Sequence, residues 1–300
     1  MRKQVFMFAA AAIMLTACEK VELSEPHSGS DAAAVPDASP SEKTKKFTFT
    51  LKGDFSDDWK PVTRGYLSAD GKDLTDVWVL DYVGGTLIQQ LHQSDNTSED
   101  FGKPVMNLAY GSHHIYIIAS RGQSPTLDTE NHILSFAKVL DTFYKDYTVD
   151  VVSTSNGNRA VTLDRVVTRL RLYFTDAIAA DAATINITPA TWHYGINYVT
   201  GAMADTKSNY TTTINIPASS IGSTTESANL YGFSTATEWT TDVAINSKKS
   251  DNTVIGSATI TAAPFRANRV TEYSGPLFSA GGSMTMSLNT TWDDGVSGTW

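Results

Sequence analysis

The sequence predicts an all-β protein, and three observations support this fold class. Charged residues make up only 18% of the 300-residue chain, whereas β-branched, aromatic and small polar residues are plentiful. Several short segments alternate between apolar and polar residues, as strands with one solvated face do. Turn-forming residues separate these segments, which favours β-sandwiches over a parallel α/β sheet.

The length and composition predict two folded domains. Three hundred residues exceed one typical domain, and an apolar content of 41% is enough to bury ordinary cores. The polar stretch Ser153-Thr154-Ser155-Asn156-Gly157-Asn158 has turn chemistry and marks a candidate boundary. We therefore predict a signal peptide at 1–17, a lipidated tether at 18–45, and β-sandwich domains at 46–155 and 156–300.

The N-terminus has the composition of a secretory leader. Arg2 and Lys3 form a basic region, and a continuous apolar run follows from residue 5 to residue 15. A run of about eleven residues is too short to span a bilayer as a permanent helix, so a signal peptide is the better interpretation.

The leader ends in Leu15-Thr16-Ala17-Cys18, which resembles the bacterial lipobox. In proteins with this motif, cleavage falls between the residues that correspond to Ala17 and Cys18, and the thiol receives a diacylglycerol. The alternative is an ordinary secretory leader with an incidental cysteine. Cys18 is the only cysteine of the chain, so its lipidation would leave the mature protein without an intramolecular disulfide. Several acyl chains would hold the protein firmly on a membrane.

The segment after Cys18 is predicted to be a disordered tether. Residues 19–45 are rich in Pro, Ser, Ala, Asp and Glu and contain almost no large apolar side chains. Such a segment cannot bury enough surface to offset its ordering entropy. A flexible chain of this length reaches on the order of 30 Å. The alternative, a folded helix, is opposed by Pro26, Pro36 and Pro40.

The first predicted strand covers residues 46–52, where the alternation is strict. Phe47, Phe49 and Leu51 fall on one face, and lysines and threonines fall on the other. Phe47, Phe49 and Leu51 are therefore candidates for a first strand that fills an apolar groove.

Further strands are predicted along the rest of the chain. The apolar runs 77–82 and 86–91 flank Val83-Gly84-Gly85, which predicts a β-hairpin because glycine tolerates the positive φ of tight turns. Residues 114–119 form a nearly continuous apolar run, typical of a central strand. Alternation predicts four more strands at 169–174, 184–187, 213–216 and 284–288.

The sequence contains none of the common catalytic motifs: no phosphate-binding Gly loop, no GxSxG, no HExxH and no CxxC. His113 and His114 are consecutive strand residues that point to opposite faces, so they cannot easily share a metal ion. Asp54, Asp57 and Asp58 lack the regular ligand spacing of a calcium loop and are interpreted as a solvated turn. We therefore predict no catalytic residues, no metal, no cofactor and no enzymatic activity.

Charge and aromatic content limit the classes of partner. The formal net charge is -9, and an acidic surface repels phosphates, so we predict no nucleic-acid partner. Six tryptophans leave two interpretations open. Exposed rings could stack on sugars, which makes glycans possible ligands, but large aromatic side chains more commonly fill sandwich cores and domain interfaces. The six are Trp59, Trp78, Trp192, Trp239, Trp292 and Trp300.

Several motifs, in their order along the chain, carry a resemblance to a known family. The chain is similar to the fimbrillin-related lipoproteins of Bacteroidetes, in particular to the FimB type of fimbrial anchor or accessory subunit. Each motif alone is a loose strand-and-turn pattern, and the specificity comes from their order. After the lipobox, the motifs are Lys46-Phe47-Thr48-Phe49-Thr50-Leu51-Lys52-Gly53, Thr63-Arg64, Val77-Trp78-Val79-Leu80-Asp81-Tyr82, Ala109-Tyr110-Gly111-Ser112-His113-His114-Ile115-Tyr116-Ile117-Ile118-Ala119, Arg159-Ala160-Val161-Thr162-Leu163-Asp164-Arg165-Val166-Val167-Thr168-Arg169-Leu170 and Asn268-Arg269-Val270-Thr271.

The resemblance implies two transthyretin-like Greek-key β-sandwiches and a role in surface fimbriae. Members of the family build or anchor fimbriae, and neighbouring subunits join when one donates a β-strand into a groove of the other. In related stalk subunits an arginine-specific protease cuts in the N-terminal region, and Arg64 could match that site. A dedicated anchor would keep its strand and lipid, so an uncut turn at Arg64 is the preferred interpretation.

Two functional hypotheses follow. The first is a fimbrial anchor or accessory subunit, held in the outer membrane through the lipid on Cys18 and joined to other fimbrial subunits as strand donor or acceptor, with a role in cell adhesion. The second is a glycan-binding surface lipoprotein of a polysaccharide-utilisation system.

Overall fold

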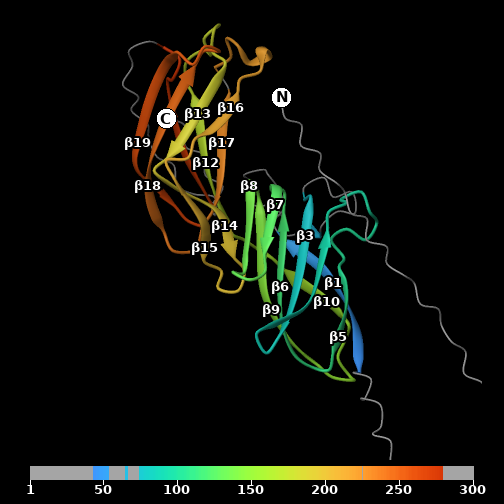
Figure 1. Cartoon of the computed structure of the whole chain (residues 1–300). Coiled ribbons are helices and arrows are strands. Elements are labelled where there is room, and N and C mark those ends of the chain that lie inside the picture. Colours follow the sequence, from blue (N-terminus) through green and yellow to red (C-terminus); the bar gives the residue numbers. More distant parts are fainter. Residues whose placement is uncertain (1–42, 54–64, 67–73, 225, 280–300) are drawn as a thin grey trace, which may run out of the picture. The chain divides into compact units, whose positions relative to one another are not determined.

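This computed structural model describes residues 43–53, 65–66, 74–224 and 226–279 (Figure 1). Across these residues the chain forms twenty β-strands and a single 3₁₀ turn, η1 (Ala218–Ser220). The strands make five sheets, in which antiparallel neighbours predominate. The predicted all-β fold is therefore confirmed. The predicted strand at 284–288 lies outside the described residues.

The first sheet is built around β1, the strand predicted at 46–52. β1 pairs in parallel with β10 on one side and antiparallel with β5 and β2 on the other. We call this the β1 sheet. Its strands are β1 (Thr44–Gly53), β2 (Gly65–Tyr66), β5 (Val105–Ala109) and β10 (Asn158–Thr162).

The second sheet has the order β11-β9-β6-β3-β4 and is here called the β6 sheet. It contains the predicted hairpin, β3–β4, whose turn residues Gly84 and Gly85 have φ of 58° and 84°. The predicted central strand is β6, which has two neighbours on each side. The strands are β3 (Asp76–Val83), β4 (Thr86–Gln93), β6 (Gly111–Ser120), β9 (Thr142–Val151) and β11 (Asp164–Arg165).

Both faces of the β6 sheet are covered, which explains the continuous apolar runs of β3 and β6. On β3, Val77 and Val79 join one buried cluster, while Trp78 and Leu80 join another. The first cluster, which we call the first core, also contains the apolar face of β1. A strand buried on both faces has no need for polar residues at every second position.

A third sheet, the β14 sheet, combines strands from distant parts of the chain in the order β15-β14-β8-β7. Ile133, Leu134 and Ser135 of β8 pair with residues 195–197 of β14. The strands are β7 (Gln123–Asp128), β8 (Ile133–Lys138), β14 (Thr191–Asn197) and β15 (Met203–Ser208).

Two further sheets complete the described fold. The β12 sheet has the order β17-β12-β20, and the β13 sheet has the order β16-β13-β18-β19. Their apolar faces contribute Leu170, Leu172, Ile187 and Val243 to the second core, which also contains Trp78 and Leu80. The strands are β12 (Val167–Phe174), β17 (Ser227–Phe233) and β20 (Arg269–Gly275), and β13 (Thr184–Pro189), β16 (Thr212–Asn215), β18 (Trp239–Lys248) and β19 (Val254–Phe265).

The predicted division into domains at 46–155 and 156–300 stays a prediction. Three strand pairings cross the line between residues 155 and 156. β10 and β11, which follow that line, pair with β1 and β9. β8, which precedes it, pairs with β14.

Candidate functional site

The candidate first-strand residues lie in the first core. Phe47, Phe49 and Leu51 each have 0% exposed surface, as their alternation predicts. The rings of Phe47 and Phe49 lie 6.3 Å apart, and the edge of Tyr147 meets Phe49 at 6.2 Å. The guanidinium of Arg159, on β10, covers the ring of Phe47 at 5.5 Å. The apolar face of β1 is thus fully enclosed.

Hydrogen bonds to other strands also hold the backbone of β1. On the β10 side, Thr48 N donates to Gly157 O at 2.7 Å, and Leu163 N donates to Lys52 O at 2.8 Å. On the β5 side, Tyr110 N donates to Lys43 O at 2.9 Å. The strands that flank β1 in its longest pairings, β5 and β10, come from parts of the chain more than 50 residues away. β1 therefore lies in a slot formed by distant segments.

Gly157, in the stretch expected to mark a boundary, allows the backbone to approach β1 closely. A Cβ atom at this position would lie 2.2 Å from Lys46 O, closer than any non-bonded contact allows. Only glycine fits there without displacing β1 or the start of β10.

Ala17, Cys18 and Arg64 lie outside the described residues, as do Asp54, Asp57 and Asp58. In the part of the chain that the structure describes, no helix is long and apolar enough to cross a membrane. The same residues contain no group of three or more His, Cys, Asp or Glu side chains able to hold a metal ion.

The two consecutive histidines point to different partners, as expected for neighbours on a strand. His114 contacts the carboxylate of Asp146 near the surface. His113 is buried, with Nδ1 2.8 Å from Asp81 Oδ1 and Nε2 2.9 Å from Ala109 O.

Both ring nitrogens of His113 have a hydrogen-bond partner. A carbonyl oxygen only accepts, so Nε2 carries a proton and donates it to Ala109. The other ring nitrogen, Nδ1, contacts the Asp81 carboxylate. Because both ring nitrogens are engaged, this buried pair leaves no free imidazole nitrogen that could act as a general base.

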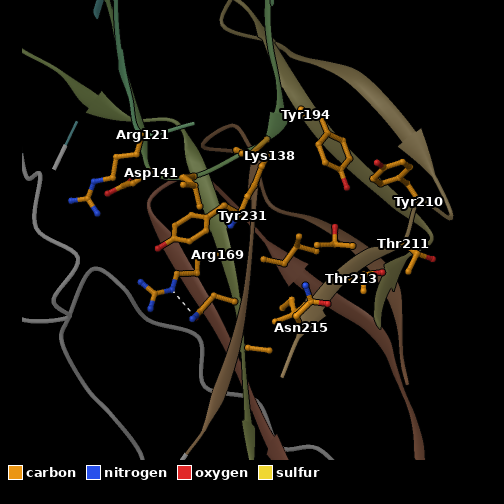
Figure 2. A pocket seen from close by; sticks show the side chains of 18 of the residues that line it. Arg121, Lys138, Asp141, Arg169, Tyr194, Tyr210, Thr211, Thr213, Asn215 and Tyr231 are labelled. Atoms are coloured by element: carbon orange, nitrogen blue, oxygen red, sulfur yellow. Dashed lines mark hydrogen bonds between the residues drawn. The ribbon is translucent and has the colours of Figure 1, made fainter. Parts of the chain in front are cut away.

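A groove of about 880 Å³, a size common for ligand sites, lies among the described residues (Figure 2). We call it the β16–β17 groove, because these two edge strands line it. The end of β8, with Lys138, and the segment between β8 and β9, with Asp141, line it as well. Figure 2 shows Tyr194 and Tyr210 on one side and Tyr231 and Arg169 on the other.

Two tyrosines form an aromatic end of the groove. The rings of Tyr194 and Tyr210 meet edge to face at 5.4 Å. Lys207 Nζ lies over both rings, 4.3 Å from the centre of Tyr194 and 5.1 Å from that of Tyr210. Tyr194 is buried, whereas Tyr210 is 47% exposed and lies at the rim.

Basic side chains outnumber acidic ones along the groove. Arg121, Lys138 and Arg169 line it, and Asp141 is the one acidic lining residue. Asp141 is bound by Arg165, whose Nε and Nη2 donate to its two carboxylate oxygens at 2.6 and 2.9 Å.

Arg169 is held in place on the opposite side. Its Nε donates to Asn229 Oδ1 at 3.0 Å, and its guanidinium lies 5.4 Å from the ring centre of Tyr231. A buried acid nearby, Glu272, pairs with Arg171 at 3.3 Å, and its pKa, which burial raises, is lowered by the charge of Arg169. The lining of the groove thus has three basic side chains and one acidic side chain, in a chain of net charge -9.

Every second residue of the edge strands β16 and β17 points its backbone N–H and C=O groups away from its own sheet. On β17, the hydrogen bond from Ser234 N to Val166 O shows which residues these are. The N–H and C=O groups of Ser227, Asn229 and Tyr231 then point away from β12. The indole of Trp192 donates to Tyr231 O at 2.9 Å, at one of these outward positions.

The tryptophans described by the structure pack in the second core or against it. Trp192 is 0% exposed and meets Phe265 at 4.9 Å and Trp239 at 5.7 Å. Trp78 is buried and Trp239 is half-buried. The core interpretation is confirmed for Trp78 and Trp192, and an exposed sugar platform at Trp192 is wrong. Trp59, Trp292 and Trp300 lie outside the described residues.

The sequence analysis did not identify the β16–β17 groove. Its residues come from six separate stretches between Arg121 and Tyr231, and no stretch has a recognisable motif. The run Thr211-Thr212-Thr213 beside Tyr210 is the one local signal, since hydroxyl and phenol groups cluster there.

Comparison with known families gives one match over more than half of the chain. Residues 126–299 match the model of a family described as "Family of unknown function (DUF6562)". No curated protein matches the sequence.

Several solved structures resemble this one at low sequence identity. A candidate adhesin from Bacteroides thetaiotaomicron is 10% identical, with 83% of this chain and 98% of that chain covered and a TM-score of 0.50. A candidate polysaccharide-binding protein from the same organism is 9% identical, with 81% and 95% covered and a TM-score of 0.50. The fimbrial anchor protein Mfa2 of Porphyromonas gingivalis is 8% identical, with 82% and 98% covered and a TM-score of 0.49.

Proposed function

The chain belongs to the DUF6562 family, and on this premise we propose that it is a cell-surface adhesion subunit of the fimbrial type. In this proposal it joins neighbouring subunits by β-strand complementation and has no enzymatic activity. The fold that it shares with a candidate adhesin supports the adhesion role. The ordered motifs of the fimbrillin-related lipoproteins, from residue 46 onward, support the fimbrial type.

The enclosure of β1 is the observation that carries this proposal. Phe47, Phe49 and Leu51 fill an apolar slot, and distant strands bond to both edges of β1. Loss of β1 would expose the edges of β5 and β10 together with the apolar floor of the first core. A strand from another subunit, with the same alternation, could satisfy both the backbone groups and the floor. In this proposal β1 fills the slot of its own subunit until a strand from a partner subunit replaces it.

Membrane attachment forms the second part of the proposal. The lipobox supports cleavage after Ala17 and lipidation of Cys18, which would hold the protein on the outer membrane at the cell surface. We assign the protein the role of an anchor or accessory subunit of the FimB type, because such a subunit keeps its lipid. Its partners are then other fimbrial subunits, and Arg64 stays uncut in this proposal, because cleavage there would separate the folded chain from the lipid on Cys18.

A disulfide lock on β1 tests the mechanism. Thr48 and Asn158 are register partners on β1 and β10, and Thr48→Cys with Asn158→Cys would tie the two strands together. The matched control is Ala244→Cys with Thr259→Cys, which joins register partners on β18 and β19. Each pair combines a half-buried and an exposed residue.

Both variants would be produced in the native cell, and their association with purified fimbriae would be measured with and without a reductant. We expect the β1 lock to abolish association until it is reduced, whereas the control lock has no effect. Full association of the oxidised β1 lock would show that β1 does not leave its slot.

Glycan binding is the second candidate function. The buried Trp192 gives it no support, but the β16–β17 groove does, because phenol, hydroxyl and amide groups line it.

A further inference from the structure

The β16–β17 groove combines three properties that the proposed strand exchange at β1 does not use. It is a hollow of ligand size, its lining has more basic than acidic side chains in an acidic protein, and that lining is rich in hydroxyl, phenol and amide groups. We propose that this groove binds an acidic saccharide, with carboxylate groups held by its basic side chains. The inference rests on the second candidate function, glycan binding at this groove, and names its ligand class; it concerns a different part of the chain from β1.

The charge of the groove selects an anionic ligand. Asp141 is bound by Arg165, so the acidic residue of the lining is already neutralised by its own partner. Arg121, Lys138 and Arg169 add positive charge around the same hollow. Carboxylates form charge-assisted hydrogen bonds with arginine and lysine, which are stronger than the bonds that a neutral ligand would form there.

The polar lining suits a sugar. Thr213 and Asn215 of β16 and Ser227 of β17 offer hydroxyl and amide groups, and Tyr210 places an aromatic ring at the rim. Sugar rings present hydroxyls at their edges and apolar C–H groups on their faces, so they match a groove with polar walls and an aromatic end.

Tyr194 forms the buried wall at the aromatic end of the groove. The residue is 3% exposed and lines the groove, and its hydroxyl is buried beside the side chain of Thr212. Burial raises the pKa of this phenol, although the nearby side chain of Thr212 lowers it.

The groove is poorly suited to an added β-strand, which is the main alternative ligand. β16 has only four residues. The hydrogen bond from Ile216 N to Ala183 O sets the alternation of its backbone groups toward and away from β13. Within β16, only Thr213 and Asn215 therefore point their N–H and C=O groups away from β13. On β17 the indole of Trp192 occupies the carbonyl of Tyr231. Short and partly covered edges offer too few ladder positions for a stable strand.

Calorimetric titration of the full mature protein tests this inference. The probes are tetragalacturonate, a hyaluronan tetrasaccharide and sialyllactose. Their uncharged counterparts are the methyl esters of the first two and lactose. An acidic peptide, hexaglutamate, tests the alternative class of ligand. We expect at least one acidic saccharide to bind, with its uncharged counterpart binding at least about tenfold more weakly, since a tenfold change reflects the loss of one or two charge-assisted contacts.

Two substitutions locate the site. Lys138→Gln removes an exposed charge at the groove, and Tyr210→Ala removes the rim ring. Each should weaken binding of the acidic saccharide by about fivefold or more. The matched control is Lys103→Gln, which removes an exposed lysine that does not line the groove. Thermal unfolding of all three variants confirms that the fold is intact.

Selective binding of an acidic saccharide that Lys138→Gln and Tyr210→Ala weaken, but Lys103→Gln does not, supports the inference. Equal binding of charged and uncharged probes, equal effects of all three substitutions, or no binding of any of the three acidic probes would overturn it. Binding of hexaglutamate as tight as that of the saccharides would overturn the saccharide assignment in favour of an acidic peptide. None of these outcomes depends on the β1 lock, so failure here leaves the proposed function standing.

Discussion

Arg165 and Asp141 form a two-pronged ion pair in which both side chains are buried. Arg165 Nε and Nη2 donate to the two carboxylate oxygens at 2.6 and 2.9 Å. A third bond, from Nη1, reaches Asn268 Oδ1 at 3.0 Å, and the guanidinium lies 4.8 Å from the ring centre of Phe143. The pair therefore ties the start of β9, the short β11 and the turn before β20 to one another.

Removal of Asp141 should be strongly destabilising. Asp141→Ala leaves the buried guanidinium of Arg165 without its counter-charge, and we expect a loss of about 3–5 kcal/mol in the free energy of unfolding. Urea unfolding followed by fluorescence measures this loss. The control is Asp164→Ala, which breaks an exposed pair with Lys145 and should cost less than about 1 kcal/mol. Equal losses in the two variants would contradict the role given to the buried pair.

Asp176 should make stability depend on pH. It accepts hydrogen bonds from the backbone N–H groups of Leu277, Phe278 and Ser279 and from the hydroxyl of Ser279, at 2.7 to 2.9 Å. Partial burial raises the pKa of Asp176, but these hydrogen bonds together lower it by a larger amount. The net shift of the pKa is therefore downward. A carboxyl group with a lowered folded pKa stabilises above its unfolded pKa and loses this effect as the pH falls through the folded value.

Asp176→Asn should therefore destabilise the protein by about 1–2 kcal/mol near neutral pH, because an amide accepts fewer of these bonds. The difference from the wild type should shrink as the pH falls below about 4, where the unfolded-state carboxyl becomes protonated. Unfolding at several pH values measures this, with the exposed Glu130→Gln as control. A difference that does not change with pH would count against the carboxylate as its origin.

Trp192 should stabilise the second core rather than bind sugar. Trp192→Ala removes a fully buried ring and the bond to Tyr231 O, and we expect a loss of about 3–5 kcal/mol. Tyr110→Ala, at a ring that is 42% exposed, should change stability by less than about 1 kcal/mol. Thermal unfolding compares the two. A stable Trp192→Ala variant that has lost only glycan binding would reverse this assignment.

Gly157 should control how firmly β1 is held. Gly157→Ala would bring a Cβ atom within 2.2 Å of Lys46 O and force β1 and β10 apart. Gly201→Ala is the matched control, because Gly201 has open space around it and a φ of 70°, so only the conformational cost of about 1 kcal/mol applies.

Hydrogen exchange of the β1 amides separates the two cases. We expect faster exchange throughout residues 44–53 in Gly157→Ala and unchanged exchange there in Gly201→Ala. Unchanged protection of β1 in Gly157→Ala would mean that the backbone adjusts without loosening the strand.

The strands that sequence reasoning located correctly share a local signature. Phe47, Phe49 and Leu51 alternate with polar residues on β1, and Gly84 and Gly85 permit the tight turn between β3 and β4. These signals depend on side-chain direction and backbone freedom over a few residues, so they can be seen without knowledge of the rest of the fold.

The features that sequence reasoning missed depend on partners far along the chain. Trp192 could be assigned to a core or to a surface only once Phe265 and Trp239 were seen to surround it. The β16–β17 groove arises where Lys138, Tyr194 and Tyr231, from three different strands, meet around one hollow.

The sequence by itself determined the all-β class, the face of β1 that is buried and the position of the first hairpin. These follow from alternation and from glycine, which act between residues close together in the chain. Only the tertiary structure decided which strands flank β1, which edges border a groove and which charges neutralise one another there. Those outcomes are set by contacts such as the one between Asp141 and Arg165, whose spacing along the chain carries no periodic signal because the residues meet only after folding.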